Sequence, residues 1–229
     1  EKMNATKFRG RWRELKRSYR LAPAIAQEAN RFADQFLANL VPALPTAPTS
    51  AIEWQQGFAN SHLGWHNMTD FDEIIALIRR TISWLLGQRN LQPADIVILT
   101  PGQREGWLVA TALEAAGLAV NHILSDNEGK IGRKSRRFHK RTFSPLDKRL
   151  KVSTIHSFKG WELPTALVIT PPDEKFWEEQ SPYLFYVAMT RAQQNLIVFN
   201  RFPAYDTYGT TWNERYHDPT APQPQLPSR

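Results

Sequence analysis

The chain has 229 residues, 41% of them hydrophobic, which is enough for a packed core in one sizeable domain or two small ones. It has no cysteine, no apolar run long enough to cross a bilayer and no signal-like N-terminal segment, which argues against disulfides, thiolate metal sites and a membrane partner. From these features we expect a cytoplasmic protein. The 29 Lys and Arg against 22 Asp and Glu give a formal net charge of +7, which suits a polyanionic partner.

Two helices are predicted in the first ninety residues. Apolar residues recur at helical spacing over 23–40, after a proline that suits a first turn. Residues 51–67 are ambiguous and contain one or two candidate strands. Asp70 precedes Glu73 by three residues, a capping-box pattern, and the apolar helical spacing then continues to Gly87. This last segment is the most clearly predicted helix.

Strands and helices alternate in the second half of the chain. A strand, a helix that Gly117 can end and a second strand are predicted within 95–123. Further strands are predicted at 151–155, 165–170 and 195–200, with a helix over 182–192. Alternation of this kind predicts an α/β fold in which a parallel sheet carries helices on both faces.

Basic residues cluster in two places, the first twenty residues and a segment that follows the predicted strand near Ile123. That segment, residues 130–141, which we call the basic loop, contains no acidic residue and seven basic ones: Lys130, Arg133, Lys134, Arg136, Arg137, Lys140 and Arg141. Such a patch suits a nucleic acid, because neutralising phosphates releases counterions. The alternative is a solvated basic loop, and the charge pattern alone leaves both open.

The sequence contains no G-x-x-x-x-G-K-[ST] loop, so the chain by itself cannot cradle nucleotide phosphates in the P-loop manner. The six histidines are scattered, and neither a Ser-His-Asp set nor a metal-ligand cluster is apparent. Without further signals, these observations favour only a protein that binds phosphate or nucleic acid.

Three segments supply a further signal, because their sequences and their order resemble motifs IV, V and VI of UvrD/Rep-like superfamily 1 DNA helicases. They are LKRSYRLAPAIAQEA (15–29), VSTIHSFKGWELPTALV (152–168) and YVAMTRAQQNL (186–196). The resemblance covers roughly residues 12 to 200. It implies a RecA-like domain of the P-loop NTPase type, the second motor domain of a helicase, without the half that carries the Walker A loop.

The resemblance also implies roles in an ATP site formed between two motor domains. Arg20 of motif IV and Arg191 of motif VI would act as arginine fingers, since a planar guanidinium stabilises charge on a transferring phosphoryl group. Tyr19 would lie against the adenine, and Glu162 would accept a hydrogen bond from the ribose hydroxyl. Gly160 would permit close approach of the backbone to the phosphates, and Lys159 would face the same cleft. ATP and Mg²⁺ are implied, with the metal ligands expected in the other half of the motor and none in this chain.

Single-stranded DNA is the implied partner on the other side of motif V. Thr154 and His156 resemble residues that donate to phosphate oxygens there. The basic loop, through Lys134, Arg136 and Arg137, is expected to add non-specific contacts. Motif V departs from the commoner form at two aromatic positions, Phe158 and Trp161, whose effect on packing or base stacking stays open. Gln103, Arg104 and Trp107 follow a predicted strand at a place where family members carry a polar segment close to DNA, although Trp107 is also a candidate for the core.

The resemblance predicts three parts: a basic segment with motif IV (1–21), the RecA-like domain (22–200) and a partly disordered tail (201–229). Family helicases insert an accessory domain before motif V, whereas here only the loop 125–150 stands at that place. Because the sequence begins at Glu1 and lacks the Walker A half, we interpret the chain as part of a longer helicase, in the family's role of DNA repair, whose N-terminal motor domain is its partner.

Two alternatives remain at the level of sequence. One is a non-catalytic nucleic-acid-binding module that keeps the fold, against which the presence of Arg20, Glu162 and Arg191 argues. The other is an RNA-directed helicase of the same superfamily, since phosphate and stacking contacts tolerate either sugar.

Overall fold

The structure is a computed structural model, and it describes residues 21–37, 41–44, 61–122, 124, 144, 147–173, 181–216 and 218–224. Within these ranges, six strands form one sheet in the order β1-β6-β5-β2-β4-β3, and every neighbouring pair is parallel. The strands are β1 His62–Asn67, β2 Ile96–Thr100, β3 Val120–His122, β4 Leu150–Thr154, β5 Leu163–Ile169 and β6 Ala192–Asn200. The α/β class and the parallel sheet predicted from the sequence are confirmed.

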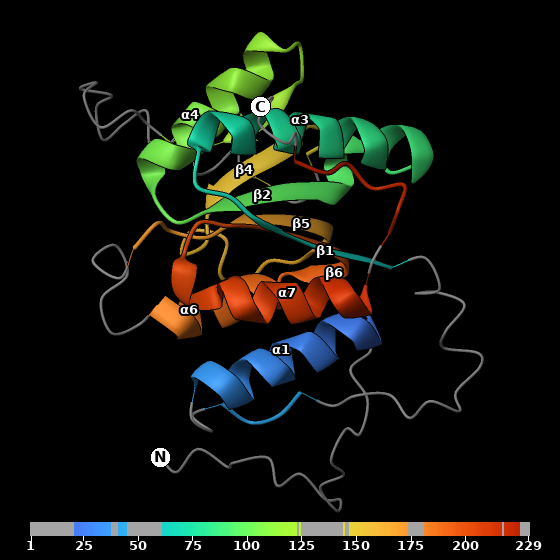
Figure 1. The fold of residues 1–229 in the computed structure, drawn as a ribbon. Coiled ribbons are helices and arrows are strands. Elements are labelled where there is room, and N and C mark those ends of the chain that lie inside the picture. The colour runs from blue at the N-terminus through green and yellow to red at the C-terminus, as the bar shows by residue number, and fades with distance from the viewer. Residues whose placement is uncertain are drawn as a thin grey trace, which may run out of the picture.

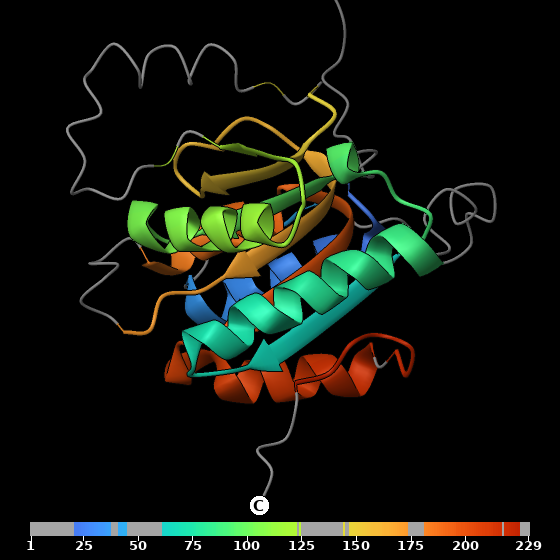
Figure 2. The same ribbon diagram turned by 90° about the horizontal axis from the view of Figure 1, so that it is seen from above.

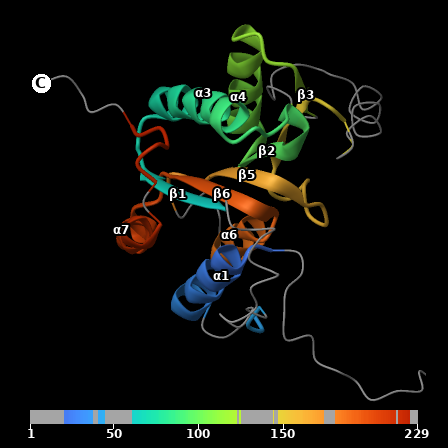
Figure 3. The ribbon, with the colours of Figure 1, turned by 90° about the vertical axis from the view of Figure 1, so that its right-hand side faces the viewer.

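Helices cover both faces of the sheet, as Figure 3 shows edge-on. One face carries α3 (Phe71–Gln88) and α4 (Gln103–Ala115), which lie side by side over the sheet in Figure 2. The other face carries α1 (Pro23–Phe36), α6 (Ser181–Met189) and α7 (Asp206–Arg215) (Figure 1). Two short 3₁₀ turns, η1 (Pro93–Asp95) and η4 (Pro203–Tyr205), precede β2 and α7.

Local sequence explains where several of these helices begin and end. The side chain of Asp70 accepts a hydrogen bond from the Glu73 amide at 2.9 Å, which caps the start of α3 and typically stabilises a helix by about 1 kcal/mol. Pro23 opens α1, where its missing amide proton costs nothing. Gly117, at φ +84°, follows the end of α4 in the left-handed region that glycine adopts without strain.

Alternation along the central strands builds two separate apolar layers. In β5, Ala166 and Val168 face the core beneath α1 and α6, whereas Leu167 and Ile169 face the core beneath α3 and α4. β2 and β6 alternate in the same way, and their apolar side chains are almost completely buried. Burying each such side chain is worth about 1.5–3 kcal/mol, so these strands anchor both layers.

The C-terminal region differs from the sequence-based division. The predicted tail begins at residue 201, yet residues 203–215 form η4 and α7, and Trp212 of α7 is fully buried. The sequence of α7 shows no clear helical pattern, because its buried hydrophobic residues are mainly aromatic and its buried face includes Gly209, which packs onto Trp65. Residues 218–224 then cross toward α3, where Ala221 joins the core of that face.

Two further segments of the sequence analysis, 51–67 and 125–150, lie only partly within the described residues. β1 lies at the end of the ambiguous segment 51–67, whose residues 51–60 lie outside the described residues. The loop expected at 125–150 also lies mostly outside them. Among the described residues, no helix is long and apolar enough to cross a membrane.

Candidate nucleotide and nucleic-acid site

The segment 155–162 joins two parallel strands, β4 and β5, which are separated in the sheet by β2. It must therefore run back from the carboxyl end of the sheet to its amino end. Ile155 and Phe158 are fully buried in the core beneath α1 and α6, so the crossover packs on that face. From the register, Glu162 at its end lies about 20 Å from Thr154 along the strand direction, at ~3.3 Å per residue.

The crossover starts with a compact turn at the carboxyl end of β4. The Thr154 hydroxyl accepts a hydrogen bond from the Ser157 amide at 3.2 Å and lies 3.0 Å from the Ser157 hydroxyl. The Thr154 carbonyl accepts from the Phe158 amide at 3.1 Å. Thr154 is buried and serves this turn, whereas His156 next to it is exposed. Of these two predicted phosphate contacts, His156 is the more accessible.

Gly160 lies in the second half of the crossover at φ +94°, a conformation that other L residues rarely adopt. No atom lies within 4 Å of a Cβ built at this position. Within this chain the glycine is therefore required by backbone conformation and not by crowding. Lys159, beside it, is exposed.

Phe158 and Trp161, the two aromatic residues at which this segment departs from the commoner form of motif V, differ in their surroundings. Phe158 is fully buried, and Trp161 is partly buried with its ring centroid 6.1 Å from that of Phe158. Phe158 thus belongs to the hydrophobic core, and Trp161 packs against it.

Arg191 occupies the turn between α6 and β6, at the amino end of the sheet. Its Nε donates to the Val187 carbonyl at 3.0 Å, its Nη1 to the Trp161 carbonyl at 3.3 Å and its Nη2 to the Thr190 hydroxyl at 3.1 Å. The side chain is only 13% exposed. Three acceptors from two different segments therefore fix the guanidinium in one orientation.

Glu162 lies beside this guanidinium, with Oε1 4.0 Å from Nη1 of Arg191 and 14% of its side chain exposed. That separation allows charge attraction but is too long for a hydrogen bond. The fold thus brings together the carboxylate and the guanidinium that the sequence placed in one site, although they belong to two separate motifs along the chain.

Other predicted site residues lie outside the described residues: Tyr19, Arg20, Lys134, Arg136 and Arg137. The described chain resumes at Leu21. The Ala22 amide donates to the Gln193 carbonyl at 2.7 Å, two residues beyond Arg191. The described part of motif IV therefore contacts the start of β6, next to Arg191.

The polar segment after β2 lies at the opposite, carboxyl end of the sheet. Gln103 and Arg104 are exposed in the first turn of α4. Gly106 allows this turn to pack closely, because a Cβ there would come within 2.7 Å of the Thr100 hydroxyl and of Leu124. Trp107 is partly buried against the core beneath α3 and α4, in agreement with its candidacy for the core.

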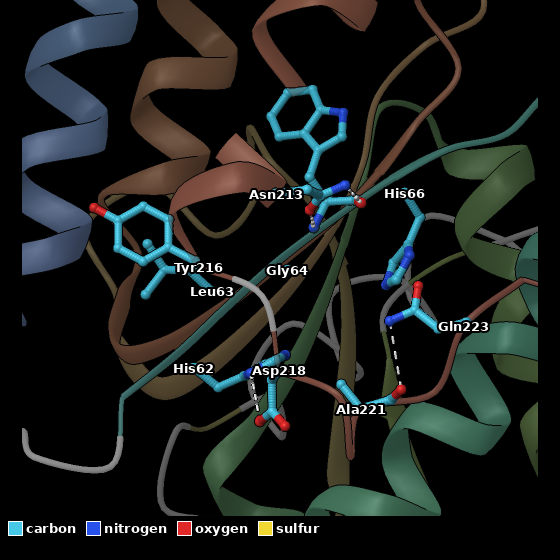
Figure 4. A pocket seen from close by; sticks show the side chains of 10 residues that line it. His62, Leu63, Gly64, His66, Asn213, Tyr216, Asp218, Ala221 and Gln223 are labelled. Carbon is cyan, nitrogen blue, oxygen red and sulfur yellow. Dashed lines mark hydrogen bonds and ion pairs between the residues drawn. The ribbon is translucent and has the colours of Figure 1, made fainter. Parts of the chain in front are cut away.

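A separate pocket borders β1, between that strand and the C-terminal segment (Figure 4). Its lining includes His62, His66 and Asp218, none of which the sequence singled out. Burial lowers the pKa of both histidines to about 4, and in His62 it outweighs the attraction of Asp218. His62 is therefore neutral near pH 7, and its 3.3 Å contact from Nδ1 to Asp218 is a hydrogen bond of a neutral imidazole.

A metal site has no support within the described ranges, where no three His, Asp or Glu side chains are grouped so that they could hold an ion.

Arg191 and Glu162 do fit one side of a nucleotide, since the Arg191 guanidinium can donate to phosphate oxygens and the Glu162 carboxylate can accept from a hydroxyl. The sequence could not indicate how Arg191 is held, because two of its hydrogen-bond acceptors are the backbone carbonyls of Val187 and Trp161. These carbonyls are present whatever side chains stand at the two positions.

Comparison with known proteins finds similarity to one family model and to solved structures. Residues 150–199, from the start of β4 almost to the end of β6, match the family model of the UvrD-like helicase C-terminal domain. The C-terminal domain of a possible DNA helicase from Lactobacillus plantarum WCFS1 has a similar structure, with a TM-score of 0.51 and 14% identity over 80% of this chain and 88% of that one. At this identity the likeness shows the fold alone. No curated protein matches the sequence.

Proposed function

We propose that this chain, whose residues 150–199 match the model of the UvrD-like helicase C-terminal domain, is the second motor domain of an ATP-dependent DNA helicase or translocase. The observation that supports this most directly is the Arg191–Glu162 pair at the amino end of β5 and β6. In a domain that only binds nucleic acid, this pair would serve only to hold the turn between α6 and β6. We place the nucleotide against this pair, between this domain and the N-terminal motor domain.

In the proposed site, Arg191 meets the charge that develops on the phosphoryl oxygens during transfer. Its three hydrogen bonds hold the guanidinium before the nucleotide arrives, so little reorganisation is needed in the transition state. Glu162 accepts from a ribose hydroxyl, and Lys159 and Arg20 add positive charge. Mg²⁺, held by the other motor domain, neutralises phosphate charge when it is bound.

We place single-stranded DNA at the carboxyl end of the sheet, where His156, Gln103 and Arg104 are exposed. Contacts to phosphates would hold the strand with little sequence preference. The crossover 155–162 runs from this edge to the proposed nucleotide edge. Movement at one end is therefore carried to the other by a short segment that is packed on the core.

The proposal is tested by Arg191→Ala in the full-length parent protein. Turnover of ATP should fall by about 10³-fold or more in kcat, while the Kd for nucleotide and for single-stranded DNA changes little. Arg191→Lys should not restore turnover fully, because a point charge lacks the planar fork. The control is Arg79→Ala, which removes an exposed arginine from α3 on the other face of the sheet. Near-normal kcat in Arg191→Ala would show a structural role and would favour a binding module.

A further inference from the structure

Glu28 of α1 carries a carboxylate that is completely buried between α1 and α7. Arg215 donates to it twice, from Nε to Oε1 at 3.0 Å and from Nη2 to Oε2 at 2.7 Å. The Tyr208 hydroxyl lies 3.1 Å from Oε2, and the Tyr216 hydroxyl lies 3.2 Å from Oε1. A carboxylate removed from water is tolerated only with donors of this kind. We call these four residues the α1–α7 clamp.

The clamp fixes the position of α1 along α7. Burial and the Glu28 carboxylate raise the pKa of Tyr216 to about 12 and raise that of Tyr208 further, so both hydroxyls keep their protons and donate. The Tyr208 hydroxyl also lies 2.8 Å from the backbone carbonyl of Glu28. A shift of α1 by one turn would leave the buried carboxylate without its donors, so the arrangement selects one register.

α1 in turn contacts the chain on both sides of Arg191. Phe32, one turn beyond Glu28, meets Phe185 of α6 edge-on with ring centroids 4.9 Å apart. Two residues after Phe185, the Val187 carbonyl accepts from Nε of Arg191. At the other end of α1, the Ala22 amide donates to the Gln193 carbonyl. Close packing of this kind transmits displacements with little loss.

We propose that Glu28 is a positioning residue for Arg191. Through the α1–α7 clamp it sets the position of α1, and α1 holds the turn between α6 and β6 from which the Arg191 guanidinium projects. The C-terminal helix α7 is then part of the support of the motor site. The effect on turnover rests on the proposed function, whereas the mechanical link between Glu28 and the turn does not.

The mechanical link is tested on this chain by amide hydrogen exchange. Glu28→Gln keeps the size of the side chain but replaces a charged acceptor with an amide that must face Arg215. Exchange at the amides of Ala22, Thr190 and Arg191 should accelerate by about tenfold or more, with the amides of β5 unchanged within about a factor of two. Tyr216→Phe, which removes one hydroxyl, should give the same pattern more weakly in a chain that still folds.

The matched control is Arg31→Ala, because Arg31 approaches Glu28 at 3.6 Å but is 54% exposed. It should leave all of these exchange rates unchanged. Unaltered exchange at Ala22, Thr190 and Arg191 in both clamp variants would overturn the proposal. A uniform increase across the sheet would overturn it as well, since it would mean general destabilisation.

The consequence for the reaction is tested in the full-length parent. Glu28→Gln should lower kcat for ATP by about tenfold with the Kd for nucleotide unchanged, measured below the unfolding temperature of the variant. A wild-type kcat in a variant whose exchange has changed would overturn the positioning role. If the wild-type parent itself hydrolyses no ATP, the proposed function fails, and the exchange experiment still decides the role of Glu28.

Discussion

Arg191 owes its orientation to acceptors that side-chain patterns do not encode. Two of its three hydrogen bonds go to carbonyls, one in α6 and one in the crossover 155–162. Substitutions at Val187 or Trp161 would keep those carbonyls provided that the backbone stays in place. The orientation of the guanidinium is therefore as robust as the packing of α6 and Phe158 beneath it.

His66 gives a prediction for the pH dependence of stability. Its pKa is about 4 in the folded chain and near 6.5 when unfolded, so below pH 6.5 the unfolded state binds more protons. The stabilising effect is fully present above pH 6.5 and is lost as the pH falls toward 4. It amounts to about 3 kcal/mol, at 1.36 kcal/mol per pKa unit. His62 should behave in the same way, for the same reason of burial.

The measurement is the free energy of unfolding in urea at pH 4.5 and pH 7. His66→Phe, which replaces a buried imidazole beside Phe199, should make the difference between the two pH values clearly smaller. The same pH dependence in His66→Phe and the wild type would contradict the prediction.

Helix α7 covers the outer edge of the sheet. β1 pairs only with β6 among the described strands, which leaves its other edge to α7. Asn213 of α7 accepts from the Trp65 amide at 3.2 Å and donates to the Trp65 carbonyl at 2.8 Å. Its side-chain amide thus takes the place of a peptide group of a further strand. Covered edges of this kind protect sheets from pairing with other chains.

Asn213→Ala should therefore destabilise the chain by about 1–2 kcal/mol, because two edge hydrogen bonds disappear and the backbone groups are left to water. Unfolding in urea measures this value. Glu214→Ala, at the exposed neighbouring position of α7, is the control and should change stability by less than about 0.5 kcal/mol. Equal stability of the two variants would show that the edge does not depend on Asn213.

The segment 218–224 adds a second link across this edge, toward α3. Asp218 approaches Arg89, the residue after α3, at 3.4 Å and His62 of β1 at 3.3 Å. Arg80 donates to the Gln223 carbonyl at 3.0 Å. The chain therefore connects α7 on one face of the sheet with α3 on the other by passing around β1 (Figure 1).

The proposed nucleotide and DNA sites lie at opposite ends of one sheet. The chain lacks a Walker A loop, so we predict no ATP hydrolysis above background by this chain alone. The assay is phosphate release by the purified chain with saturating single-stranded DNA, with the full-length parent as positive control. Robust turnover by the chain alone would contradict the division of the site between two domains.

The basic charge of residues 130–141 predicts a salt-dependent affinity for nucleic acid. Replacing Lys134, Arg136, Arg137 and Lys140 by Gln should flatten the dependence of DNA affinity on salt, by about one unit of slope for each phosphate that the loop no longer neutralises. The measurement is log Kd against log salt for a single-stranded oligonucleotide and for the matched RNA. An unchanged slope would mean that the loop is only solvated, and tighter binding of RNA would favour the RNA-directed alternative.

The alternation of strands and helices, the parallel sheet and the grouping of Glu162 with Arg191 could be predicted from the sequence, because they follow from local periodicity and from a resemblance carried by contiguous segments. Tertiary structure alone decided what surrounds them. Glu28 and Arg215 are 187 positions apart, and the aromatic α7 becomes a helix because it packs on Trp65 and α1. Hydrogen bonds to carbonyls and buried pairs between distant segments leave no periodic trace in a sequence. They depend on distances that only the packed chain defines.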